Sequence, residues 1–134
     1  MLAGRYCMND PGDPLDWVAK AENDLKLMRS AMRHKEPITD GACFHAQQCA
    51  EKYLKAILVE KNKSFPKTHD LVALSELCES VGVIVPVDAD RLEMLSNYAV
   101  QARYPSAVPT PEDARSAIAT AQSIRIFARK ILSV

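Results

Sequence analysis

The sequence predicts an all-α protein, an antiparallel up-and-down bundle of about five helices, in which residues 14–134 form one domain. Five segments carry apolar residues at the three- and four-residue spacing of a helix with one buried face. Their connections are short, and no internal repeat or low-complexity segment interrupts them. The one strand-like run, VIVP at residues 83–86, is too short and isolated to form a sheet. A length of 134 residues suits a single hydrophobic core.

Prolines and capping residues mark the first two helices. Asp13 and Pro14 supply an N-cap and a first-turn proline, and the run HKEP ends the helix that they begin. Its expected core stripe consists of Trp17, Ala21, Leu25, Met28 and Met32. The second helix is expected to begin near Asp40 and to continue to about Lys63, where the run NKSFPK breaks it.

The third and fourth helices are expected to be shorter. Thr68 or Asp70 caps the third helix, which ends at Gly82. Its apolar stripe consists of Leu71, Leu74, Leu77, Cys78 and Val81. Asp88 is expected to cap the fourth helix, which Pro105 closes. The stripe of the fourth helix consists of Leu92, Leu95, Ala99 and Ala102.

The last helix begins with a pattern that resembles a capping box. Thr110 and Asp113 have the required spacing, and Pro111 occupies the first turn. Small and apolar residues then follow along a heptad-like seam: Ala114, Ala117, Ala121, Ile124, Ala128 and Ile131. Such a seam lets a neighbouring helix approach closely.

The composition restricts the possible functions. Lys and Arg total 17, and Asp and Glu total 17, so any affinity for nucleic acid or an anionic membrane must come from a local patch. Glu51 and Lys55 have the spacing of an ordinary surface ion pair. No glycine-rich phosphate loop, HExxH motif or cluster of Cys and His ligands occurs, so we expect no metal site and no cofactor.

The cysteines and the N-terminal segment lead us to expect a cytoplasmic protein. The four cysteines contain no CxxC pair and are expected to be small core residues in a reducing compartment: Cys7, Cys43, Cys49 and Cys78. Residues 1–13 lack an apolar run and are rich in turn formers. They predict a flexible tail rather than a signal peptide or a membrane span.

The second helix carries two kinds of side chain outside its expected core face. The core face consists of Ala42, Ala46, Cys49, Ala50, Tyr53, Leu54 and Ile57. A polar stripe follows at spacings of three, four and three: His45, Gln48, Lys52 and Lys55. Phe44, Leu58 and Val59 lie beside that stripe. Either another helix of the same bundle covers these three, or they mark a homodimer contact or a ligand groove.

Three sequence motifs occur in a specific order along the chain. They are ACFHAQQCAEKYLKAIL at residues 42–58, KTHDL at residues 67–71 and YAVQARYP at residues 98–105. Together they resemble the HEPN family, the higher-eukaryote and prokaryote nucleotide-binding domains, over Asp16 to about Leu132. The resemblance implies a small helical bundle, usually a homodimer, that is often encoded beside or fused to a minimal nucleotidyltransferase. In some such pairs the HEPN protein is a metal-independent ribonuclease toxin, and the nucleotidyltransferase is an antitoxin that modifies it.

The resemblance also implies a ribonuclease motif, which this chain keeps only in part. The motif is an Arg followed by a His after four to six residues, near the end of the penultimate helix; the Arg steadies a phosphate and the His moves a proton. Arg103 has the position of the Arg, but the run YPSAVPTP after it contains no His. A literal match from Arg29 to His34 lies at the end of the first helix, where the family does not keep its site. His69 is the best substitute because helix ends gather in a bundle, and the alternative is a structural hydrogen bond at a cap.

A local cationic pocket is a second hypothesis for the site. Arg103 can clamp a phosphate, and Tyr104 can stack on a base or present its hydroxyl to a modifying enzyme. The other candidate nucleotide contacts are His69 and the polar stripe: His45, Gln48, Lys52 and Lys55. Each of these residues also has a structural alternative. Arg103 can bond the last carbonyls of its helix or pair with Asp70, and Tyr104 can pack at the helix end. Solvation or an interhelical hydrogen bond can account for His45.

Three functions therefore stay open. We favour a HEPN-type nucleotide-binding or interaction subunit that dimerises and pairs with a minimal nucleotidyltransferase, as in a toxin–antitoxin pair. The second is a ribonuclease toxin that uses Arg103 with His69. The third is a helical scaffold without a ligand.

Overall fold

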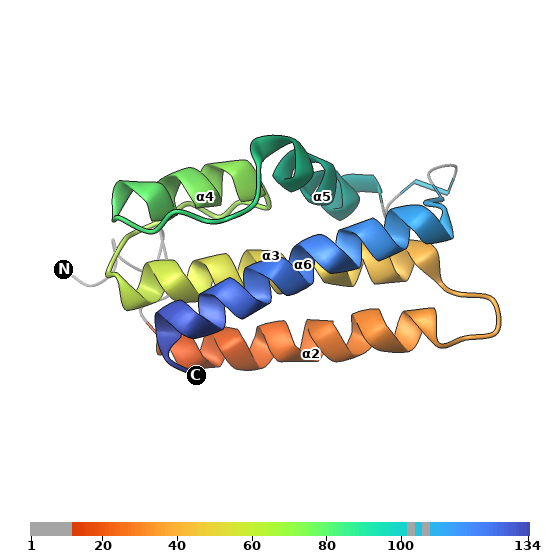
Figure 1. The fold of residues 1–134 in the computed structure, drawn as a ribbon, viewed down its shortest axis with the longest axis horizontal. Coiled ribbons are helices and arrows are strands. Elements are labelled where there is room, and N and C mark those ends of the chain that lie inside the picture. The colour runs from red at the N-terminus through yellow and green to blue at the C-terminus, as the bar shows by residue number, and fades with distance from the viewer. Residues whose placement is uncertain (1–11, 102–103, 106–107) are drawn as a thin grey trace.

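The structure, a computed structural model, describes residues 12–101, 104–105 and 108–134 (Figure 1). These residues form the helices α2 (Pro14–Met32), α3 (Thr39–Glu60), α4 (Leu71–Ser80), α5 (Ala89–Gln101) and α6 (Pro111–Leu132). Over these ranges the chain contains no strand. The predicted all-α helical bundle is thereby confirmed. Residues 1–11 of the expected tail, and Ala102 of the expected fourth stripe, lie outside the described residues.

Side-chain caps fix the starts of several helices, as the sequence predicts. The Asp13 carboxylate accepts a hydrogen bond from an amide of the first turn of α2, at 2.9 Å. Thr110 and Asp113 form a capping box in both directions at α6. Of the two candidates at α4, Asp70 is the cap, and Thr68 instead accepts a hydrogen bond from the amide of Asp70.

The end of α3 differs from the prediction by about one turn. The helix ends at Glu60 rather than near Lys63, and Asn62 has a φ of 55°. A left-handed residue at this position stops the helix, and asparagine tolerates that conformation better than most side chains. Gly82 follows the end of α4 by two residues and has a φ of 84°. A residue with a Cβ would be strained in this conformation.

Helix α3 is the centre of the bundle. It contacts each of the other four helices that the structure describes. Figure 1 shows α2 on one side of α3 and the shorter α4 and α5 on the other. The hydroxyl of Thr39 at the start of α3 donates to the Pro109 carbonyl just before α6, and Arg129 near the end of α6 donates to the Tyr53 hydroxyl. Helix α6 therefore runs beside α3 in the same direction.

The loop between α4 and α5 completes the core. Val83, Val85 and Val87 are buried, whereas Ile84 and Pro86 between them are exposed. The strand-like alternation of this segment thus belongs to an extended loop that lies on the core and pairs with no other strand in the described parts of the chain. None of the described helices is both long enough and apolar enough to cross a membrane.

Candidate functional site

Polar side chains of α3 form two clusters with residues of its neighbours. The Asp24 cluster contains Asp24 of α2 with His45 and Lys52 of α3. The Glu51 cluster contains Gln47, Glu51 and Lys55 of α3 with His69, which precedes α4. Gln48 lies between the clusters along α3, and its amide donates to Gln47 Oε1 at 2.6 Å.

Asp24 is buried between α2 and α3, with 5% of its surface exposed. Its Oδ1 lies 2.8 Å from His45 Nδ1, and its Oδ2 accepts a hydrogen bond from the ammonium of Lys52. A buried carboxylate requires partners of this kind, because an unpaired charge in the interior is strongly unfavourable. His45 and Lys52 are therefore directed towards α2, and the interhelical hydrogen bond that was one interpretation of His45 is confirmed.

Glu51 is the centre of the second cluster. Its Oε1 accepts hydrogen bonds from Gln47 Nε2 at 3.0 Å and from His69 Nδ1 at 2.7 Å, and its Oε2 accepts one from Lys55 Nζ at 2.9 Å. Burial opposes the charged form of Glu51, but the hydrogen bonds from Lys55, Gln47 and His69 together outweigh it and lower the pKa of the carboxyl below 4.5. Glu51 is consequently a carboxylate at neutral pH.

Lys55 is buried, which corrects two predictions. Its side chain is 9% exposed, and its ammonium lies 5.6 Å from the centre of the Trp17 ring and 5.7 Å from that of Phe65. Cation–π attraction and the Glu51 carboxylate together replace the lost water. The pair of Glu51 and Lys55 is therefore not a surface ion pair, and Lys55 has no exposed ammonium with which to contact a nucleotide.

His69 lies at the edge of a pocket of about 460 Å³ between the start of α4 and α5. The pocket is lined by His69, Asp70, Val72, Glu93, Ser96, Asn97 and Val100. Ser96 fixes the two helices relative to each other, since its hydroxyl accepts from the Leu71 amide and donates to the Leu92 carbonyl, both at 2.9 Å. The side chain of His69 is 61% exposed, so its ring is held by Glu51 on one side and accessible on the other.

The described residues do not form the single cationic pocket that the sequence suggested. His45 and Lys52 bind Asp24 on the α2 side, whereas Lys55 and His69 bind Glu51. Each of these groups lies against a buried carboxylate, so the polar stripe is not a row of free positive charges. Tyr104 is 59% exposed. Arg103, the other key residue of that hypothesis, lies outside the described residues.

The three candidate dimer residues differ in their surroundings. Leu58 is fully buried, so the alternative that other parts of the same chain cover it is correct, and it has no surface left for a second copy. Phe44 is half-buried, with its ring edge-on to His45 at 5.3 Å between centroids. Val59 is also half-buried and packs against the core. Phe44 and Val59 remain candidates for a dimer contact.

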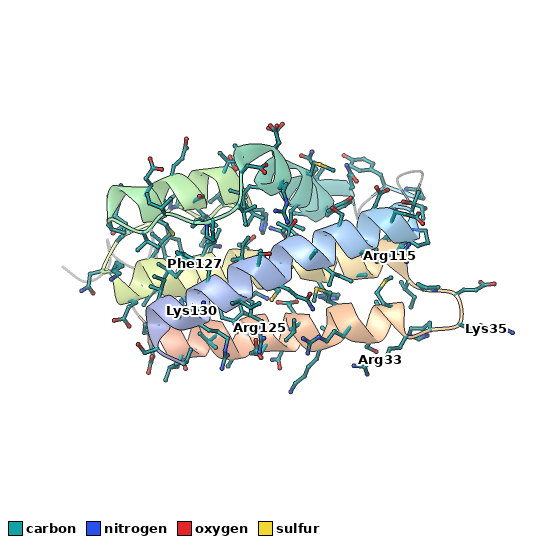
Figure 2. The ribbon with its side chains drawn as sticks, in the orientation of Figure 1. Arg33, Lys35, Arg115, Arg125, Phe127 and Lys130 are labelled. Carbon is teal, nitrogen blue, oxygen red and sulfur yellow. The ribbon has the colours of Figure 1, made fainter. Side chains whose placement is uncertain are left out.

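A third polar group connects α2, α3 and α6, and the sequence analysis missed it. Arg125 of α6 donates from Nε and Nη2 to the two oxygens of Glu22 on α2, at 2.7 Å and 3.0 Å. Figure 2 shows Arg125 on the side of α6 that faces α2. The Tyr53 hydroxyl of α3 also donates to Glu22. The hydrogen bond from Arg125 lowers the pKa of Glu22, although burial acts in the opposite direction. Glu22 and Arg125 are 103 residues apart in the sequence, so no local pattern indicates their contact.

Neither a metal site nor a reactive thiol is found in the described part of the chain. No group of three or more His, Cys, Asp or Glu side chains there could hold a metal ion. Cys43, Cys49 and Cys78 are buried free thiols, as expected of core residues. Burial raises the pKa of Cys43 to about 11 and the pKa values of Cys49 and Cys78 to about 12, which makes them weak nucleophiles. Cys7 lies outside the described residues.

Comparison with known proteins shows the family to which this chain belongs. The family model of the HEPN domain matches residues 15–131. The chain belongs to the HEPN domain family. Its fold is similar to the crystal structure of TT1696 from Thermus thermophilus, with a TM-score of 0.70 and 24% sequence identity over 88% of this HEPN chain and 97% of that chain. At this identity the likeness shows the fold alone. None of the curated proteins gives a significant match.

Proposed function

We propose that this HEPN chain is a nucleotide-binding or interaction subunit that works with a minimal nucleotidyltransferase in a toxin–antitoxin-like pair. The observation that carries the proposal is the HEPN match over residues 15–131, which covers nearly the whole bundle. The pocket beside His69 and the polar surface of α3 support a binding role for that bundle. In such a pair, the partner supplies the nucleotide-transfer chemistry.

The candidate nucleotide contacts are those polar side chains that keep some exposed surface. Lys52, His45 and Gln48 are partly exposed along α3, and Tyr104 is largely exposed. A phosphate that binds Lys52 must compete with the Asp24 carboxylate for its ammonium. We therefore expect modest affinity that weakens as salt is added, because ionic contacts near a surface are screened.

The partner is tested by co-expression with a minimal nucleotidyltransferase encoded next to this chain. We expect the two proteins to elute together. With ATP, the Tyr104 oxygen should bond to the α-phosphorus, pyrophosphate should leave, the hydroxyl proton should pass to solvent, and the mass of the HEPN chain should rise by one AMP group. Tyr104→Phe should remove the added mass, whereas Tyr98→Phe, at a half-buried tyrosine of α5, should not. Separate elution together with an unchanged mass would show that the proposed pair does not exist.

A ribonuclease is the second candidate, and the exposure of His69 at the pocket favours it. In this reaction His69 takes the proton of a ribose 2′-hydroxyl, and the 2′-oxygen attacks the adjacent phosphorus. The bond from phosphorus to the 5′-oxygen breaks, and the 5′-oxygen takes a proton from water. Arg103 is proposed to stabilise the charge on the phosphate. Purified protein should then cleave RNA in EDTA, and both His69→Ala and Arg103→Ala should abolish cleavage. His34→Ala serves as the control, and a His69→Ala variant as active as the wild type excludes this mechanism.

A further inference from the structure

We propose that Glu51 orients the His69 ring so that the ring accepts a hydrogen bond from a ligand in the pocket between α4 and α5. This ligand is an uncharged group that carries hydroxyls, the ribose of a nucleoside. The assignment of the ligand rests on the nucleotide-binding role proposed above. The positioning role of Glu51 rests on the geometry of the Glu51 cluster alone.

The contact with Glu51 determines which nitrogen of the His69 ring carries the proton. Glu51 is ionised and can only accept, so the contact of 2.7 Å requires a proton on His69 Nδ1. A neutral imidazole with its proton on Nδ1 carries a lone pair on Nε2. That nitrogen is then the acceptor that the exposed side of the ring presents.

Two neighbours on α3 hold the Glu51 carboxylate in place. Lys55 holds one carboxylate oxygen and Gln47 holds the other. The Gln47 amide also lies 3.3 Å from the backbone carbonyl of His69, so α3 fixes both the main chain and the side chain of that residue. A histidine with 61% of its side chain exposed would otherwise lose this orientation to rotation.

The charges around the pocket do not suit an anionic ligand. The pocket lining includes the carboxylates of Asp70 and Glu93, and no Lys or Arg occurs among its described lining residues. The first amides of α4 are also engaged, by Ser96 at Leu71 and by the Asp70 side chain in the next two residues. Since the described lining contains no cation and the first backbone amides of α4 are already bonded, a phosphate is unfavourable in this pocket.

The remaining groups suit a sugar hydroxyl. Asn97 offers both a donor and an acceptor, and Val72 and Val100 supply apolar surface. A hydroxyl can donate to His69 Nε2 and accept from the Asn97 amide. The volume of about 460 Å³ lies within the range of about 300 to 1,000 Å³ for small-molecule sites.

The positioning role is tested without any ligand by long-range ¹H–¹⁵N spectra of histidine-labelled protein at pH 8.5. We expect neutral His69 to carry its proton on Nδ1 in most molecules. Glu51→Gln should shift this population towards the Nε2 proton, whereas Glu60→Gln, at an exposed glutamate of the same helix, should leave it unchanged. The wild-type spectrum decides the question even if Glu51→Gln fails to fold, because a proton found mainly on Nε2 overturns the proposal.

The ligand class is tested by titrating uniformly ¹⁵N-labelled protein with adenosine, guanosine, cytidine and uridine, and separately with inorganic phosphate. At least one nucleoside should shift the resonances of His69 Nε2 and the Asn97 amide, and phosphate should leave them in place. His69→Phe should lower the affinity for that nucleoside at least tenfold, whereas His34→Phe should leave the affinity unchanged. The assignment fails if phosphate shifts His69 more than every nucleoside does, or if no nucleoside shifts it.

A further titration with AMP separates this inference from the proposed function. If AMP shifts the resonances of Lys52 and Gln48 while His69 and Asn97 stay unchanged for all probes, nucleotide binding stands and the ribose assignment is wrong. If co-elution with the nucleotidyltransferase and binding of every nucleotide are both absent, the proposed function is wrong. The position of the His69 proton then still decides the role of Glu51.

Discussion

Glu51 and Asp24 show how single buried carboxylates are accommodated in this bundle. Each has an ammonium group as a partner, Lys55 for Glu51 and Lys52 for Asp24, and each also contacts a histidine. Removing one member of such a pair leaves the other charge buried and unpaired. That loss costs more free energy than the intact pair contributes to stability.

Replacing Lys55 by methionine tests this at the scale of one residue. Methionine keeps the apolar contact with Trp17 and Phe65 but leaves Glu51 without its ammonium. We expect Lys55→Met to lower the free energy of unfolding by about 3 kcal/mol, measured by urea denaturation. The double variant Glu51→Gln with Lys55→Met should recover part of the loss, because both charges are gone.

Lys26→Met is the matched control, since Lys26 is exposed on α2. Its effect on stability should stay within about 0.5 kcal/mol. An equal effect of the Lys26 and Lys55 substitutions would show that the Lys55 ammonium is solvated rather than paired in the interior.

At the scale of helices, an ion pair connects α2 with α6. Both helices pack against α3. The two-bond contact of Arg125 with Glu22 spans them, and the Tyr53 hydroxyl of α3 completes the group, with Arg129 donating to it at 3.2 Å. Loss of this contact should therefore loosen α6 more than the loss of an exposed ion pair on the same helix.

Arg125→Met should lower the free energy of unfolding by about 1 to 2 kcal/mol. Both charged groups are about one-quarter exposed, so solvent screening keeps the effect below that of a fully buried pair. Arg115→Met is the control on α6, because its pair with Glu112 is exposed and should contribute less than about 0.5 kcal/mol. Thermal unfolding of the two variants measures this difference. A lower stability of Arg115→Met than of Arg125→Met would contradict it.

For the whole molecule, stability should fall at acid pH. The pKa values of Glu22 and Glu51 are lowered below 4.5 in the folded state, so the unfolded chain binds protons first as the pH drops. The stabilisation from both groups is complete above about pH 5 and is lost as the pH falls through their folded-state pKa values.

Urea unfolding between pH 7 and pH 3 measures this dependence. Glu22→Gln and Glu51→Gln should each reduce the loss of stability below pH 4.5, because each removes one titrating group. Glu60→Gln, at an exposed residue, should show the same acid dependence as the wild type. A wild-type stability that does not change down to pH 3 would contradict the lowered pKa values.

The proposed homodimer also belongs to this scale. If Phe44 and Val59 lie in its interface, light scattering should give twice the chain mass of 14.8 kDa. Phe44→Asp should then yield a monomer, because burying an aromatic side chain of this size contributes about 1.5 to 3 kcal/mol. Ile84→Asp, at an exposed apolar residue of the loop before α5, should leave the dimer intact. An unchanged mass for Phe44→Asp would rule out this face as the interface.

Local sequence patterns were sufficient to predict the helices and their caps. The caps at Asp13, Asp70 and Thr110 depend on side chains that bond amides two or three residues away. The buried stripe of each helix likewise depends on spacing within one segment. His69 was identified as a candidate from its place beside a cap, and it does lie at a pocket.

Only the tertiary structure decided which polar residues of α3 face the interior. Lys52 and Lys55 look equivalent in the sequence, yet Lys52 keeps partial exposure beside α2 and Lys55 is buried against Trp17 and Phe65. Leu58 is buried for the same reason, because α3 has neighbours on several sides and one helical period cannot show how many faces are covered. The sequence by itself thus determined the helices, most of their limits and the family resemblance, and the end of α3 was predicted about one turn too late. The partners of Glu51 and Glu22 were decided by packing, since residues up to 103 positions apart meet only when the bundle has formed.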